Sequence, residues 1–166
     1  NVILVFLVGL LSGCWSKMIP LYDGKRLPSA EVATVHPGIL SKNDSKFQSK
    51  IWITKVNGER RTVYSAEVLP QSYDFETFVS RNFNATTDLV NRTDIRFTPK
   101  AGHVYIIYGY NEPKEKTKPG KLVRASVWVW VVDYDSKQVV WGKRPDGKLK
   151  KNGWIEVYPE REELPD

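Results

Sequence analysis

Apolar residues in this chain occur in short runs that alternate with polar residues, and turn-forming sequences separate the runs. The clearest run is residues 51–56, which is rich in β-branched residues and is followed directly by Asn57-Gly58. An Asn-Gly pair after such a run is a strong hairpin signal, so we expect a return strand over residues 62–69 that stops at Pro70. No stretch keeps the 3.6-residue period of an amphipathic helix. The pattern therefore predicts a chain built from strands.

Further strands are predicted over residues 32–35, 73–79, 95–97, 104–110, 123–132, 138–141 and 154–158. Residues 123–132 are apolar on both faces, which indicates a strand that is buried on both sides near the centre of its sheet. The polar segments 41–50, 82–94 and 112–121 are predicted loops. Short strands with frequent turns between them are typical of an all-β fold. We therefore expect a single antiparallel β-sandwich of roughly seven to eight strands.

A different pattern occupies the start of the chain. Residues 2–14 form an uncharged apolar run that ends in Leu11-Ser12-Gly13-Cys14. The run is shorter than the about 20 apolar residues that a membrane-spanning helix needs, and its small-residue end fits the cleavage site of an export signal. A core strand with a buried cysteine is the alternative. Because the sequence starts at Asn1 without a basic segment, we expect the Met and basic residues of the signal upstream.

Leu11-Ser12-Gly13-Cys14 resembles the lipobox of bacterial lipoproteins. In that family the signal is cut just before the cysteine, and the cysteine then carries the acyl chains that hold the protein in a membrane. The resemblance implies that Cys14 is the lipidated first residue of the mature protein and that its covalent lipid takes the place of any cofactor. In Gram-negative lipoproteins an Asp after the cysteine favours the inner membrane. Trp15 stands there instead, which implies the periplasmic face of the outer membrane.

The expected organisation has three parts. Residues 1–13 are the signal peptide, residues 14–28 are the lipidated N-terminus and a tether, and residues 29–166 are the β-sandwich domain. The tether is predicted because the segment contains Pro20, Asp23-Gly24 and Pro28 and has little periodicity.

Short motifs in the domain resemble a broad group of small exported lipoproteins. The first part of the resemblance is Tyr22-Asp23-Gly24, then Leu27-Pro28, then Glu31-Val32-Ala33. The second is a Phe-x-x-x-Ala-Gly-His-x-Tyr motif over residues 97–105. The chain departs from the group at Leu69-Pro70-Gln71, where those proteins have Leu-Pro-Gly. The motifs imply strand starts and tight turns, and the resemblance implies no particular activity for this chain.

The formal net charge is +6 and the isoelectric point is about 9.3. A positive charge suits association with anionic lipid headgroups or a cell-wall polymer, and it equally suits a solvated surface. We expect the membrane as one partner and an envelope protein or cell-wall polymer as another, with no nucleic acid. Cys14 is the only cysteine, so a lipidated Cys14 leaves no disulfide to stabilise the domain.

Catalytic and metal-binding motifs are missing from the sequence. His36 and His103 are far apart and lack the spacing of a metalloprotease helix, and a zinc site needs three or four ligands. We expect His103 to close a turn at a strand start. We expect Asp133, Asp135 and Asp146 to lie in turns, as the turn propensity of aspartate predicts. A calcium site formed by these residues is the less favoured alternative. We therefore expect no metal site and no enzyme.

Aromatic residues offer the one candidate ligand surface. Trp128 and Trp130 share one face of an extended strand, and so do Tyr108 and Tyr110. Such a face could stack on a sugar or dock a peptide. A core position is favoured for these four side chains, because the valines between the tryptophans make the opposite face apolar too.

These observations predict a membrane-anchored periplasmic lipoprotein that acts as a non-catalytic interaction or assembly module. The alternative is a cell-wall glycan-binding lipoprotein that uses exposed aromatic residues, and a cell-wall hydrolase is less favoured. Exposed tryptophans would favour the glycan binder, and a pair of carboxylates about 5–9 Å apart in a cleft would favour the hydrolase. A closed, fully packed sandwich would favour the interaction module.

Overall fold

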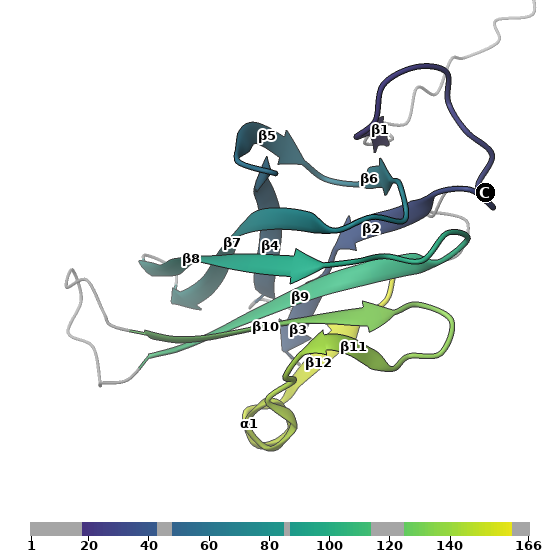
Figure 1. Cartoon of the computed structure of the whole chain (residues 1–166). Helices are drawn as coiled ribbons and strands as arrows, with labels where there is room; N and C mark the ends of the chain where they lie inside the picture. Colours follow the sequence, from purple (N-terminus) through teal and green to yellow (C-terminus); the bar gives the residue numbers. More distant parts are fainter. Residues whose placement is uncertain (1–17, 43–47, 85–86, 114–124, 161–166) are drawn as a thin grey trace, which may run out of the picture.

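The computed structural model describes residues 18–42, 48–84, 87–113 and 125–160, which form strands and one short helix, α1 (Figure 1). The elements are β1 (Ile19–Pro20), β2 (Ala33–Pro37), β3 (Ile39–Lys42), β4 (Gln48–Val56), β5 (Glu59–Val63), β6 (Ala66–Val68), β7 (Tyr73–Asn84), β8 (Thr87–Phe97), β9 (Val104–Pro113), β10 (Ala125–Asp133), β11 (Val139–Gly142), α1 (Asp146–Lys151) and β12 (Trp154–Val157). The all-β sandwich is confirmed, with twelve described strands rather than seven or eight.

Two sheets make up the sandwich. The first sheet has the order β1-β6-β2-β9-β10-β11, and the second has the order β12-β3-β4-β7-β8, with β5 paired to β4 outside that path. Most neighbouring strands are antiparallel, but β1 with β6 and β2 with β9 are parallel. The strand pairing therefore differs from a purely antiparallel sandwich at these two places.

The predicted hairpin at Asn57-Gly58 is confirmed. Both residues have positive φ angles, 50° and 82°, as a type I′ turn requires. The predicted return strand is two strands, however, because β5 pairs with β4 whereas β6 joins the first sheet beside β2. The chain therefore changes sheets between Val63 and Ala66, and all three residues of β6 are buried there.

A second change of sheet occurs at Gly38, between β2 and β3. The Gly38 N–H donates to Ile107 O at 2.7 Å, and a Cβ at this position would lie 2.5 Å from the Tyr108 ring. A glycine is therefore needed for the chain to pass this close to β9. The prediction of a loop over residues 41–50 is wrong at its ends, because β3 runs to Lys42 and β4 begins at Gln48. Residues 43–47 lie outside the described part of the chain.

The predicted loop over residues 82–94 is wrong as well, because β7 and β8 form a long hairpin that pairs from Tyr73↔Phe97 to Asn84↔Thr87. β8 is an edge strand of the second sheet, and an edge strand tolerates polar residues that a central strand does not. In the predicted loop at 112–121, β9 extends to Pro113 and the remaining residues lie outside the description.

The core lies on both faces of β9, where every residue from 105 to 111 is buried. Tyr105 and Ile107 pack with the residues of β4, β7 and β8, whereas Ile106, Tyr108 and Tyr110 pack on the opposite face. That opposite cluster also contains Leu40, Trp130, Val132, Leu149 and Trp154. β9 is thus buried on both faces along this stretch. β10, between β9 and β11, is also buried on both faces at Trp130, Val131 and Val132, so the prediction of a buried interior strand over residues 123–132 is confirmed there. Residues 126–129 are only half-buried, and residues 123 and 124 lie outside the described residues.

The segment assigned to the tether belongs partly to the fold. Ile19 N–H donates to Ser65 O at 3.2 Å, and Leu21 N–H donates to Glu67 O at 2.8 Å, so β1 extends the first sheet at its edge. Among the described residues, α1 is the only helix, and it is far too short and polar to cross a membrane.

Candidate functional site

The candidate site residues predicted from the sequence differ in where they lie in the structure. Cys14 lies outside the described residues. Tyr108, Tyr110 and Trp130 are fully buried, so the core position favoured for them is the one the structure shows. Trp128 is half-buried and its ring lies 4.8 Å from Lys148 Nζ on α1. These four aromatic residues therefore do not form an exposed surface.

Hydrogen bonds explain how tyrosines and a tryptophan can be fully buried in this core. Tyr108 OH donates to Val157 O at 2.9 Å, and Trp130 Nε1–H donates to Glu156 Oε1 at 2.7 Å. Burial raises the pKa of Tyr108 far above its usual range. The hydroxyl therefore stays protonated and keeps donating to β12.

Glu156 is a nearly buried carboxylate in this region. Besides Trp130, it accepts hydrogen bonds from Tyr158 OH at 2.7 Å and from Arg144 Nη1 at 3.2 Å. Burial and the bond to Glu156 raise the pKa of Tyr158. Because internal donors occupy the carboxylate, its role is to hold β12 and the residues after it, rather than to face a substrate.

His103 and Asp133 form a second polar group, at the start of β9 and the end of β10. His103 Nδ1 lies 2.7 Å from Asp133 Oδ2, and the Ser136 N–H and Oγ–H both donate to Asp133 Oδ1 at 2.9 Å. The serine hydroxyl thus bonds to the carboxylate and not to the histidine, which is the wrong order for a nucleophilic triad. The group fastens the turn after β10, consistent with the turn-closing role expected for His103.

The motif over residues 97–105 is explained by the same corner. Gly102 has a φ of +75°, and its N–H donates to Val32 O at 2.7 Å. The rings of Phe97 and Tyr105 meet edge to face at 4.8 Å, and the Lys100 N–H donates to Tyr105 OH. The motif therefore specifies how β8 turns into β9 and docks on β2.

Asp133 is predicted to make stability depend on pH. Burial raises its pKa, but the hydrogen bonds from Ser136 and His103 outweigh burial, and the net shift is downward. A carboxyl whose pKa is depressed on folding stabilises the fold above its unfolded pKa of about 3.9, and this stabilisation is lost as the pH falls through the folded pKa. We expect Asp133→Asn to lower the free energy of unfolding by about 1–2 kcal/mol at pH 7, measured by urea denaturation.

The exposed carboxyl of Asp94 supplies the control for this prediction. Asp94→Asn is expected to change the free energy of unfolding by less than about 0.5 kcal/mol at pH 7. At a pH below the folded pKa of Asp133, the difference between Asp133→Asn and the unsubstituted protein should shrink. A difference that stays constant across the acid range would contradict the assignment.

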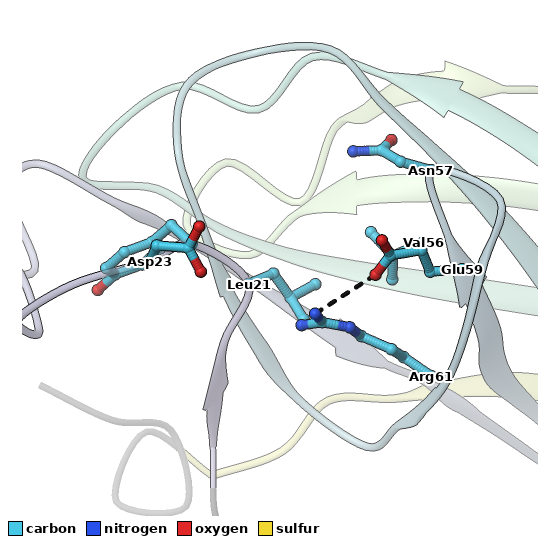
Figure 2. Close-up of a pocket in the computed structure, with 7 residues that line it drawn as sticks. Leu21, Asp23, Val56, Asn57, Glu59 and Arg61 are labelled. Carbon is cyan, nitrogen blue, oxygen red and sulfur yellow. Dashed lines mark ion pairs between the residues drawn. The ribbon is translucent and has the colours of Figure 1, made fainter.

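A small polar hollow lies between the loop after β1 and the β4–β5 hairpin (Figure 2). Its volume is about 200 Å³, and it is lined by Leu21, Tyr22, Asp23, Val56, Asn57, Glu59 and Arg61. Figure 2 shows Arg61 reaching across the hollow toward Leu21 while it pairs with Glu59 at 3.4 Å. The hollow combines charges of both signs and has room for a small polar group, but it presents no nucleophile beside a base.

The outer face of the second sheet carries an aromatic pair that the sequence analysis did not single out. Trp52 on β4 and Phe78 on β7 are directly opposite one another, both half-buried, with ring centroids 5.8 Å apart and planes tilted by 55°. Arg92 on β8 is opposite Phe78. The alternation of side chains along β4 could have identified Trp52 from the sequence. Trp52 lies between the buried Ile51 and Ile53, so its side chain must point away from the core.

Ion pairs lie beside this aromatic pair on the same sheet. Lys55 Nζ lies 2.7 Å from Glu76 Oε2, and Arg96 Nε lies 2.6 Å from Asp74 Oδ1. These pairs lower the pKa of both carboxyls, through hydrogen bonds from Lys55 and Arg96. The outer face of β4, β7 and β8 therefore combines two large aromatic side chains with fixed charges of both signs.

Together these features define a small two-sheet β domain whose candidate sites lie on its surface. Among the described residues, no three His, Cys, Asp or Glu side chains gather closely enough to hold a metal ion. No protein-family model matches the chain, and comparisons with curated proteins and with solved structures give no match.

Proposed function

We propose that this protein is a lipoprotein of the bacterial envelope whose β-sandwich is a non-catalytic interaction module. Cys14 is the lipid-bearing residue, and the domain lies on the periplasmic face of the outer membrane. Leu11-Ser12-Gly13-Cys14 supports the anchor. The packing of β9 supports the role of an interaction module. Core side chains fill the interior of the sandwich on both faces of this strand, so a partner has to bind at the surface.

The outer-face pair Trp52 and Phe78 is the observation that carries the proposal. The core does not need these side chains, since the strand positions on either side of them already point inward. Partly exposed aromatic residues beside an arginine and within a rim of charges are typical of protein–protein interfaces. We therefore assign another envelope protein as the partner and the outer face of β4, β7 and β8 as its binding surface.

A glycan is the second candidate, and one observation favours it. The Trp52 indole is partly exposed, and sugars bind by stacking on an open aromatic face. The 55° tilt between the Trp52 and Phe78 rings breaks the flat platform that a glycan chain would need, which ranks this candidate below a protein partner. A cell-wall hydrolase ranks third, since Glu156 is occupied by internal donors and the His103 group lacks the order of a triad.

A photo-cross-linker at the outer face tests this proposal. With benzoylphenylalanine in place of Trp52, we expect a discrete adduct with one envelope protein in intact cells. With the cross-linker in place of Val140, a side chain of β11 that is 46% exposed, we expect no such adduct. Trp52→Ala should then weaken binding to the purified partner by about 30-fold, the effect of losing about 2 kcal/mol at a hot spot.

The same variants separate the two candidates. If Trp52→Ala abolishes sedimentation with purified cell-wall glycan and no protein adduct forms at position 52, the glycan binder replaces the protein partner. If adduct yields at positions 52 and 140 are equal, the outer face is not the binding surface.

A further inference from the structure

The described fold begins very close to the proposed anchor. Cys14 and Ile19 are five positions apart, and Ile19 is the first residue of β1. Five extended residues span at most about 18 Å. A domain of this length is about 35–40 Å across, so the tether is shorter than half the domain. The inference that follows rests on the proposed function, because it takes Cys14 as the residue inserted in the membrane.

The segment after β1 is fastened to the domain and does not lengthen the tether. Glu67 on β6 is buried, and its carboxylate accepts hydrogen bonds from Tyr22 OH at 3.2 Å and from Arg26 Nε at 2.9 Å. Leu27 N–H in turn donates to Tyr22 OH at 3.1 Å. Releasing this segment would leave Glu67 as a buried, unpaired charge, which is costly.

The end of the domain at β1 has side chains suited to a lipid surface. Ile19 and Tyr64 are 41% and 58% exposed, and they are neighbours because Ile19 N–H donates to Ser65 O. Tyrosine favours the headgroup region, where its ring is partly buried and its hydroxyl is solvated. Lys25, after β1, and Arg60, on β5, are exposed and form no ion pair within the described residues. Basic side chains are attracted to headgroup phosphates.

We propose that this end of the domain rests on the phospholipid headgroups of the membrane that holds Cys14. The contact surface is assigned to Ile19, Lys25, Arg60 and Tyr64, and the hollow in Figure 2 is lined by residues near them in the chain, such as Leu21 and Arg61. Figure 1 shows β1, β5 and β6 at one end of the domain and α1 at the opposite end, which is therefore directed away from the bilayer.

Hydroxyl-radical labelling on vesicles tests this orientation. The chain that begins at Cys14 is coupled through this single thiol to a maleimide lipid in phosphatidylethanolamine–phosphatidylglycerol vesicles. We expect labelling of Tyr64 and Ile19 to fall about fivefold relative to the uncoupled chain, the factor that corresponds to about 1 kcal/mol of headgroup contact. Ile155 and Val157 on β12 are the matched controls, since they are 55% and 40% exposed, and their labelling should not change.

Two variants show which features impose the orientation. A flexible insertion of about 20 Gly and Ser residues after Ser16 adds about 25 Å of reach, and it should return Tyr64 labelling to nearly the uncoupled level. Lys25→Gln with Arg60→Gln should reduce the protection of Tyr64 on these vesicles, whereas Lys150→Gln with Lys151→Gln on α1 should leave it unchanged.

Equal changes in the labelling of Tyr64 and Ile155 on coupling would overturn the proposal, and so would Tyr64 labelling that coupling does not lower. Protection of Tyr64 that survives the insertion would support the headgroup contact and assign it to the side chains of this end instead of the short tether. Because coupling at Cys14 is chemical, none of these results depends on whether cells lipidate this residue. A failure of the orientation is therefore distinguishable from a failure of the anchor, which is tested separately.

Discussion

Replacing Cys14 with serine is expected to abolish lipidation and to release nearly all of the protein from the membrane fraction. The acylating enzyme of bacterial lipoproteins forms a thioether on the cysteine sulfur, and a serine hydroxyl offers no thiol for that bond. The measurement is metabolic labelling with a radioactive fatty acid, followed by membrane fractionation in high salt. Ser12→Thr, two residues away, keeps the thiol and should remain labelled.

The release should be nearly complete because the remaining attraction to a membrane is weak. A stable anchor needs more than one acyl chain or an equivalent device. Basic residues near an anionic surface contribute about 1 kcal/mol each, and high salt screens this attraction. The chain has a mean hydropathy of −0.41, and its described residues contain no helix that could span a bilayer.

Two outcomes would contradict this expectation. A serine variant that still takes up label would show that Cys14 is not the acylated residue. An unlabelled variant that stays in the membrane fraction would show that an uncleaved N-terminal segment or a tightly bound partner holds the protein there. Each result would remove the anchor from the proposed function.

Local signals in the sequence predicted those parts of the fold that depend on local chemistry. Asn57-Gly58 specifies its turn through two positive φ angles, and the alternation of residues 73–79 specifies which face of β7 is buried. These features follow from backbone sterics and from a period of two residues. The sandwich class could therefore be predicted before any tertiary contact was known.

Features that depend on tertiary contacts escaped the prediction. Nothing local to Tyr64 or Ser65 indicates that β5 and β6 belong to different sheets, because β6 is specified by β1 and β2, which lie elsewhere in the chain. β9 carries tyrosines and an asparagine that appear polar, yet they are buried because distant groups such as Val157 O and Val79 O accept their hydrogen bonds.

The candidate sites divide in the same way. Alternation alone could have found Trp52 as an outward-facing aromatic residue, whereas its cross-strand neighbour Phe78 depends on the register of β4 and β7. The hydrogen bonds of Tyr22 and Arg26 to Glu67 could not be predicted from the sequence, since they depend on the pairing of β1 with β6. Predicted tether residues thereby became part of the domain.

Trp130→Ala is expected to be among the most destabilising substitutions in this protein. The Trp130 side chain is fully buried, its ring stacks on Tyr108 at 5.8 Å, and its Nε1–H donates to Glu156. Removing a buried tryptophan side chain costs about 3–5 kcal/mol, and the carboxylate left without this donor adds to the cost. Domains are stable by only about 5–15 kcal/mol, so this loss removes a large fraction of the free energy of unfolding.

Two matched variants separate the contributions to this loss, with the free energy of unfolding measured by chemical denaturation. Trp128→Ala removes the same side chain from the same face of β10, but Trp128 is half-buried, so we expect a loss of only about 1–2 kcal/mol. Trp130→Phe retains a ring against Tyr108 and removes the donor to Glu156, so its loss should fall between those of the two alanine variants.

Equal losses for Trp128→Ala and Trp130→Ala would contradict the burial of Trp130 behind β12. A Trp130→Phe variant as stable as the unsubstituted protein would show that the bond to Glu156 contributes nothing, and that packing against Tyr108 alone holds this side of β10.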